Sequence, residues 1–110
     1  MNENDILGKL YDIAVERKNE PIENSYTNYL FEKGLDKILK KVGEETTEVI
    51  VASKNDNKQD TICEIADLLY HLSVLMAQKE IKPEEIAEEL DRRHQKSGNK
   101  KAERKPIENF

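Results

Sequence analysis

Two segments decide the fold: residues 35–54 read LDKILKKVGEETTEVIVASK, and residues 58–79 read KQDTICEIADLLYHLSVLMAQK. Their apolar residues recur at the spacing of an amphipathic helix, and the stretch from Ile65 to Ala77 is apolar on nearly all sides. Between the two segments, Asn55-Asp56-Asn57 is typical of a turn. We therefore expect an antiparallel helical pair whose second member is central and covered on most sides.

The flanking sequence also favours helices, because proline and glycine are scarce and nothing in residues 1–94 alternates with the period of a strand. Further helices are predicted over about residues 3–18, in a short segment around Tyr29, and from about residue 82 onward. The expected starting and ending residues are Pro21, Ser25 or Thr27, Gly34, Asp60 or Thr61, Pro83 and His94. The predicted fold is an all-α, four- to five-helix antiparallel bundle.

Composition limits how such a bundle can be stabilised. The chain has 110 residues, of which 36% are hydrophobic and 37% are charged, so one domain is expected with little apolar surface to bury. We predict a domain over residues 1–95, a basic tail over 96–110, and a core completed by homodimerisation. The tail segment 91–110 carries a formal charge of +4 and residues 1–90 carry −9. Such an acidic body repels nucleic acid and suits a cation site.

Several other classes of protein are disfavoured. No segment approaches the ~20 apolar residues of a membrane span, and the N-terminal residues lack the basic-then-apolar order of a signal peptide. Cys63 is the only cysteine, which excludes an internal disulfide and a four-thiolate zinc site. A cytoplasmic protein without membrane or nucleic-acid partners is expected.

Each of the two predicted central helices carries a pair of acidic residues at the edge of its apolar face, where charged side chains are unfavourable. Glu45 and Glu48 lie on the shoulder of the first apolar face, and Glu64 and Asp67 occupy the same place on the second. About seven residues separate Glu48 from the turn, and about seven more lead to Glu64, so both pairs should lie at one height along the hairpin. The four carboxylates are predicted to converge.

Converging carboxylates repel one another and lose hydration unless a cation compensates them. Oxygen ligands favour Mg²⁺, with Mn²⁺ as an alternative, and a di-iron bundle is disfavoured because His71 has no counterpart on the first helix. The alternative is a solvated acidic surface, on which Glu44 and Glu48 pair with neighbouring lysines.

Three stretches make the sequence recognisable: Ser25-Tyr26-Thr27, residues 34–45 (GLDKILKKVGEE) and residues 64–72 (EIADLLYHL). With them the chain resembles the phosphoribosyl-ATP pyrophosphatase family, within the all-alpha nucleoside triphosphate pyrophosphatases that include MazG-like enzymes. The resemblance covers roughly residues 3–95. It implies a homodimeric, magnesium-dependent hydrolase that converts 1-(5-phosphoribosyl)-ATP to 1-(5-phosphoribosyl)-AMP and pyrophosphate, the second step of histidine biosynthesis. Many members of this family are fused to a cyclohydrolase domain that binds zinc through cysteines. This chain has neither the length nor the cysteines for that domain, so the stand-alone form is expected.

The resemblance implies the metal ligands, and the positions of charged and aromatic residues suggest the other roles. The implied metal ligands are Glu45, Glu48, Glu64 and Asp67, and the candidates for the catalytic base are Glu44 and Glu48. The candidate substrate-binding residues are Lys41, Lys54, Tyr26, Arg92 and Arg93. Each has an ordinary alternative: a solvated lysine, a cation at a helix C-terminus, or a core aromatic residue. His71 is interpreted as an interior histidine with satisfied hydrogen bonds.

Two other functions remain open from sequence. One is a MazG-like house-cleaning pyrophosphatase that acts on a deoxynucleotide, which would share the metal site and differ in its pocket. The other is a non-catalytic helical adaptor, in which the acids only keep a dimer soluble.

Overall fold

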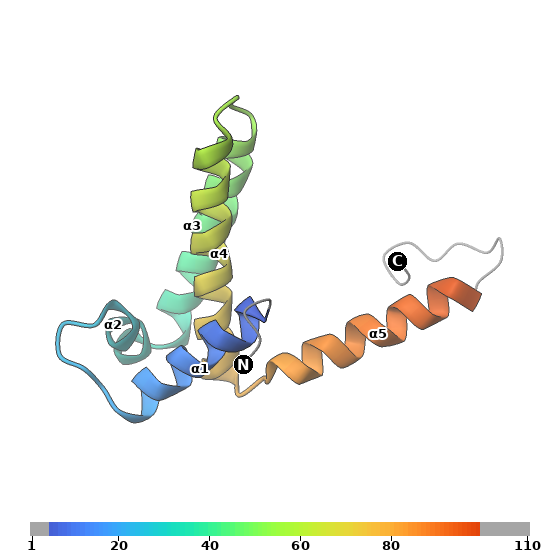
Figure 1. Cartoon of the computed structure of the whole chain (residues 1–110). Coiled ribbons are helices and arrows are strands. Elements are labelled where there is room, and N and C mark those ends of the chain that lie inside the picture. The colour runs from blue at the N-terminus through green and yellow to red at the C-terminus, as the bar shows by residue number, and fades with distance from the viewer. Residues whose placement is uncertain (1–4, 100–110) are drawn as a thin grey trace.

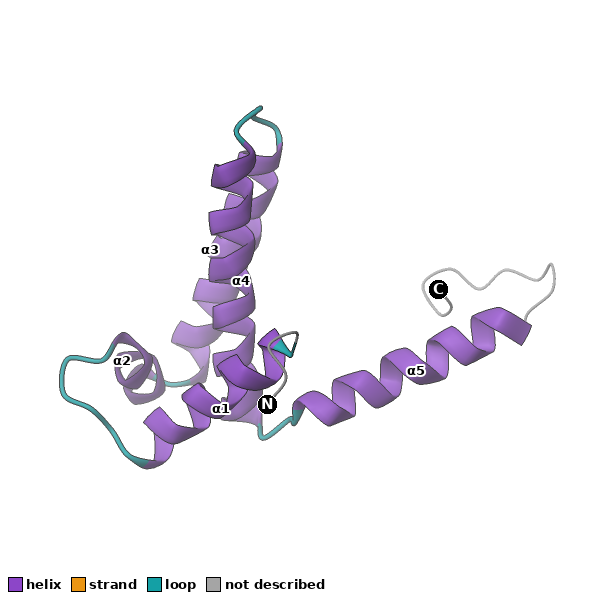
Figure 2. Cartoon of the chain, in the orientation of Figure 1, coloured by secondary structure: helices purple, strands orange, loops and turns teal. Residues whose placement is uncertain are grey.

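The computed structural model describes residues 5–99, and these residues form five α-helices and no strand (Figure 2). This confirms the all-α prediction. The helices are α1 (Ile6–Asn19), α2 (Tyr26–Lys33), α3 (Leu35–Ser53), α4 (Lys58–Lys79) and α5 (Pro83–Asn99).

The long hairpin of α3 and α4 is the centre of the structure, and these two helices make the most extensive contact of any pair. Figure 1 shows α1 and α2 gathered at the base of this hairpin, where α3 begins and α4 ends. The buried core lies at that base and receives side chains from four helices. Its members are Ala14, Leu30, Ile38, Val74 and Ala77.

Local capping fixes where the helices begin. Ser25 caps α2, as one of the two predicted candidates, by accepting from the backbone N–H of Asn28 at 3.3 Å. The predicted cap of α4 at Asp60 or Thr61 is wrong, because Asn57 of the turn accepts from the N–H of Asp60 at 3.2 Å. Asn57 has the extended backbone of a cap residue, so the helix begins directly after the turn.

The last helix differs from its prediction in length and in position. It runs to Asn99 rather than ending near His94, because one glycine in a helix costs only about 1 kcal/mol and no proline follows until Pro106. Figure 1 shows α5 leaving the other four helices, so it does not join a five-helix bundle within one chain. The proposed division at residue 96 stays a prediction, and residues 100–110 lie outside the described part.

The prediction that α4 is covered on most sides is also wrong within a single chain. His71 and Val74 are buried, but Ile65 is 43% exposed and Leu69 is 37% exposed. The cause is the arrangement of the helices, since none of the other helices formed by residues 5–99 lies beside the outer half of the α3–α4 hairpin (Figure 1). The extents are 54 × 35 × 29 Å. Within residues 5–99, no helix combines the length and apolar character needed to cross a membrane.

Candidate metal centre

Three of the four carboxylates that the sequence predicted to converge lie together between the two central helices. Glu45 projects from α3, while Glu64 and Asp67 project from α4. One oxygen atom from each lies within 4.8 Å of the others. The equal spacing on either side of the turn produces this register, because antiparallel helices place residues equidistant from their turn side by side.

The surroundings of this acidic group oppose a negative charge. The side chain of Glu45 is only 13% exposed. Partial desolvation raises the pKa of Glu64, and the charges of Glu48, Asp67 and Glu45 raise it further. Glu48, the fourth predicted ligand, lies outside the group of three, but it is close enough for its charge to act on Glu64. The structure thus concentrates more negative charge than the local groups neutralise.

One ammonium group partly offsets this charge. Lys41 Nζ lies 3.2 Å from Glu44 Oε1 and 3.7 Å from Glu45 Oε1. Its hydrogen bond to Glu44 is the largest cause of a raised pKa for Lys41. Two predicted site residues, Lys41 and Glu44, therefore contact each other at the edge of the carboxylate group.

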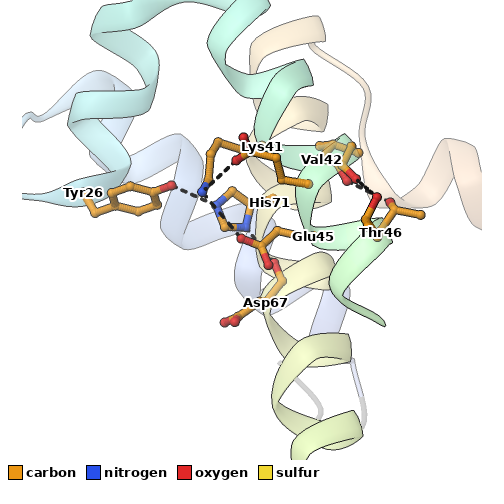
Figure 3. Close-up of polar contacts among 10 residues, drawn as sticks. Tyr26, Lys41, Val42, Glu45, Thr46, Asp67 and His71 are labelled. Atoms are coloured by element: carbon orange, nitrogen blue, oxygen red, sulfur yellow. Dashed lines mark hydrogen bonds and ion pairs between the residues drawn. The ribbon is translucent and has the colours of Figure 1, made fainter. Parts of the chain in front are cut away.

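A hydrogen-bonded chain joins α2 to the same place. In Figure 3, Tyr26, Lys41, His71 and Glu45 gather between the helices. His71 Nδ1 lies 2.7 Å from the backbone oxygen of Asp67, and His71 Nε2 lies 3.0 Å from the hydroxyl of Tyr26. A carbonyl only accepts, so Nδ1 carries the proton in neutral His71 and Tyr26 donates to Nε2. His71 is 5% exposed and has both nitrogens paired, as the interior interpretation predicted.

The three converging carboxylates fit a hard divalent cation. All three are carboxylates, which are the ligands that Mg²⁺ and Mn²⁺ prefer. Only Glu45 of the three contacts an ammonium group among the described ion pairs. Glu64 is partly desolvated and is repelled by the neighbouring carboxylates. A bound cation would stabilise its negative charge.

Comparison with known proteins agrees with this geometry. The sequence model of the family described as phosphoribosyl-ATP pyrophosphohydrolase matches residues 7–94. The chain belongs to this family. It is 65% identical to phosphoribosyl-ATP pyrophosphatase of Clostridium acetobutylicum and 61% identical to that of Clostridium novyi, each over 110 residues and the full length of both chains.

Phosphoribosyl-ATP pyrophosphohydrolase sequences also occur within longer chains. The histidine biosynthesis bifunctional protein HisIE of Caldanaerobacter subterraneus is 59% identical over 92 residues, which cover 84% of this chain and 45% of that protein. The family resemblance inferred from the three motifs is therefore confirmed.

Three of the candidate substrate-binding residues of this phosphoribosyl-ATP pyrophosphohydrolase family member lie away from the converging carboxylates. Lys54 follows α3 at the turn, and about 13 Å of helix separates it from Glu45. Arg92 and Arg93 both contact Glu89 on α5, at 2.5 Å and 2.8 Å, and α5 points away from the site (Figure 1). Within one chain, these three residues are not brought to the metal centre.

The sequence interpretation missed one cluster near the site. The ammonium groups of Lys33 and Lys37 each lie 5.8 Å from the ring centroid of Tyr29. Tyr29 in turn stacks on Tyr26, with centroids 6.0 Å apart. The separation of Tyr29 and Lys33 by one helical turn was a usable signal, but Lys37 comes to the same ring only through the corner at Gly34.

Removal of the Tyr26 hydroxyl should show how much the Tyr26–His71 hydrogen bond contributes to the free energy of unfolding. Tyr26→Phe leaves the buried Nε2 of His71 without its donor, which should lower the free energy of unfolding by about 1–3 kcal/mol. Tyr29→Phe is the matched control, because the hydroxyl of Tyr29 has no hydrogen bond within residues 5–99. Urea unfolding followed by circular dichroism measures both. Equal stability of the two variants would contradict the assignment.

Proposed function

We propose that this chain is a hydrolase that cleaves phosphoribosyl-ATP to phosphoribosyl-AMP and pyrophosphate, a step of histidine biosynthesis. The observation that carries the proposal is the convergence of Glu45, Glu64 and Asp67 in a member of this family. The names of relatives 56–65% identical to this chain supply the substrate.

Glu45, Glu64 and Asp67 would hold Mg²⁺, with Glu48 beside them as the proposed fourth ligand. A magnesium ion bound there would supply charge neutralisation to the phosphates and a lower pKa to an attacking water. The protein side chains do the rest. Lys41 places a positive charge at the edge of the group, where it can contact a phosphate oxygen. The Tyr26–His71 chain fixes the N-terminal end of α2 against this site.

We propose Glu48 rather than Glu44 as the base that takes the proton of the attacking water. Glu44 is engaged by Lys41 at 3.2 Å, whereas Glu48 is exposed and has no ion pair among the described residues. A base needs a lone pair free to accept a proton within hydrogen-bond reach of the reacting water. If one carboxylate oxygen of Glu48 binds the ion, its second oxygen would keep such a lone pair. Glu44 then serves to hold Lys41 in place.

A pyrophosphate-release assay tests the function. Purified protein is incubated with phosphoribosyl-ATP, dUTP or dCTP, each with magnesium and with EDTA. We expect magnesium-dependent release from phosphoribosyl-ATP alone. Preference for dUTP or dCTP would instead support a house-cleaning pyrophosphatase, and release from none of the three would support an adaptor.

We also propose that two copies form a homodimer through the exposed apolar side chains of the α3–α4 hairpin and of α5. Exposed apolar side chains lie on both of its helices and on α5, which is unusual for a monomer of this size. They are Leu39, Ile50, Val51, Ile62, Ile65, Leu69, Ile86 and Leu90. Arg92 and Arg93 of one copy could then contact phosphates bound by the other. A cytoplasmic location is proposed because Cys63, the only cysteine, is free and exposed.

Leu69→Arg should convert the dimer to a monomer, because it places a charge in the apolar face of α4. Sedimentation or light scattering should show the loss of about half the mass, while the helical content is kept. Lys9→Glu, on the exposed face of α1, is the control and should remain dimeric. A wild-type protein that is monomeric at all concentrations would contradict the proposal.

A further inference from the structure

The cluster of Lys33, Lys37 and Tyr29 is not used by the proposed chemistry. Lys33 lies in the last turn of α2 and Lys37 in the first turn of α3, and both ammonium groups reach the ring of Tyr29. Neither lysine has an ion pair among residues 5–99. Two like charges that share one ring and have no carboxylate partner favour an anion between them.

The backbone places these two lysines together. Gly34 joins α2 directly to α3 and has a φ of 93°, a left-handed conformation that glycine adopts without strain. The chain therefore turns sharply between the helices, and residues on both sides of the corner meet over one ring. This is a built arrangement rather than two independent surface lysines.

An aromatic surface continues from this cluster to the metal centre. Tyr29 stacks on Tyr26 with ring planes 25° apart, and the hydroxyl of Tyr26 meets His71 beside the carboxylates. Tyr26 and Tyr29 also line a cavity of about 870 Å³ between α2 and the loop that precedes it. That volume is within the usual range of small-molecule sites.

The substrate of the proposed function has the same order of chemical groups. Phosphoribosyl-ATP carries a triphosphate at one end, an aromatic purine in the middle and a 5-phosphate monoester at the other end. We propose that Lys33 and Lys37 bind this distant phosphate, while Tyr29 and Tyr26 stack against the purine between the two ends. This inference rests on the proposed function, and the two lysines would let the site distinguish phosphoribosyl-ATP from ATP, which lacks the 5-phosphate monoester.

Steady-state kinetics tests the proposal through the K33M/K37M double variant. Loss of two charge-assisted contacts should raise KM for phosphoribosyl-ATP by about ten- to a hundredfold, with kcat within about twofold. K33R/K37R keeps the charges and should restore a KM near that of the wild type. K9M/K58M removes two exposed lysines elsewhere and should leave KM unchanged. An unchanged KM in K33M/K37M would overturn the assignment.

Inhibition shows which end of the substrate the lysines bind. Ribose 5-phosphate should inhibit the wild type competitively, ribose should not, and K33M/K37M should lose most of the inhibition. Inhibition by pyrophosphate, which probes the metal end, should be the same in both proteins. If K33M/K37M weakened inhibition by pyrophosphate as much as inhibition by ribose 5-phosphate, the lysines would be assigned to the triphosphate and the proposal would be overturned.

A binding readout separates this inference from the proposed function. Ribose 5-phosphate titrated into the labelled wild type should shift the amide resonance of Gly34, and should not shift it in K33M/K37M. This holds whether or not the protein releases pyrophosphate. Failure of the wild type to release pyrophosphate from phosphoribosyl-ATP would therefore refute the proposed function. Absence of the Gly34 shift in the wild type would refute the phosphate site.

Discussion

Glu64→Gln should reduce magnesium-dependent pyrophosphate release by on the order of a hundredfold to a thousandfold while leaving the fold intact. The substitution keeps the shape of the side chain and removes the charge that a cation needs. Glu88→Gln, an exposed acid on α5, is the matched control and should keep full activity. The measurement is the same pyrophosphate assay at saturating substrate and several magnesium concentrations.

The stability of the metal-free protein should change in the opposite direction. Desolvation and the charges of Glu48, Asp67 and Glu45 raise the pKa of Glu64 above its ordinary value of 4.5. The folded state therefore binds this proton more tightly than the unfolded state, so stability rises as pH falls through the folded pKa towards 4.5. In EDTA, Glu64→Gln should melt at or above the wild-type temperature at neutral pH and lose this part of the pH dependence.

Magnesium gives a further contrast between the two proteins. A ligand at a hundred times its Kd stabilises the state that binds it by about 2.7 kcal/mol. The melting temperature of the wild type should rise with magnesium, and that of Glu64→Gln should rise much less. Equal stabilisation of both proteins would show that Glu64 is not part of a metal site, even if activity were lost.

Much of this site was accessible from sequence because it depends on helical register alone. The spacing of Glu45 from the turn, and of Glu64 and Asp67 after it, fixes their common height once two helices are antiparallel. No long-range information is needed. The bounds of α3 and the end of α4 were predicted within a residue, since the turn and the apolar periodicity both identify them. The cap of α4 was predicted three or four residues after its observed position at Asn57.

The parts that were not predicted depend on how separate elements meet. The Tyr26–His71 bond spans 45 residues, and the cluster at Tyr29 needs the corner at Gly34. The position of α5 depends on its few contacts with the other helices. Apolar periodicity showed that α4 has faces to bury, but it could not show that residues 5–99 leave Ile65 and Leu69 partly exposed.

Leu30→Ala should be the most destabilising single truncation, because Leu30 is fully buried in the core where four helices meet. Truncation of a buried leucine costs about 2–5 kcal/mol, through lost apolar burial and the cavity that remains. The total free energy of unfolding of a small domain is roughly 5–15 kcal/mol, so this loss is a large fraction of it. Ile22→Ala is the control, since Ile22 is 51% exposed and its truncation should change stability by less than about 1 kcal/mol.

The same truncation tests whether the core positions the site. Leu30 anchors α2, and that helix carries Tyr26, Tyr29 and Lys33. Measured well below its melting temperature, Leu30→Ala should therefore raise KM for phosphoribosyl-ATP more than it lowers kcat, because the carboxylates belong to α3 and α4. A loss of kcat at unchanged KM would mean that α2 acts on the metal centre itself, through Tyr26 and His71, rather than on substrate binding.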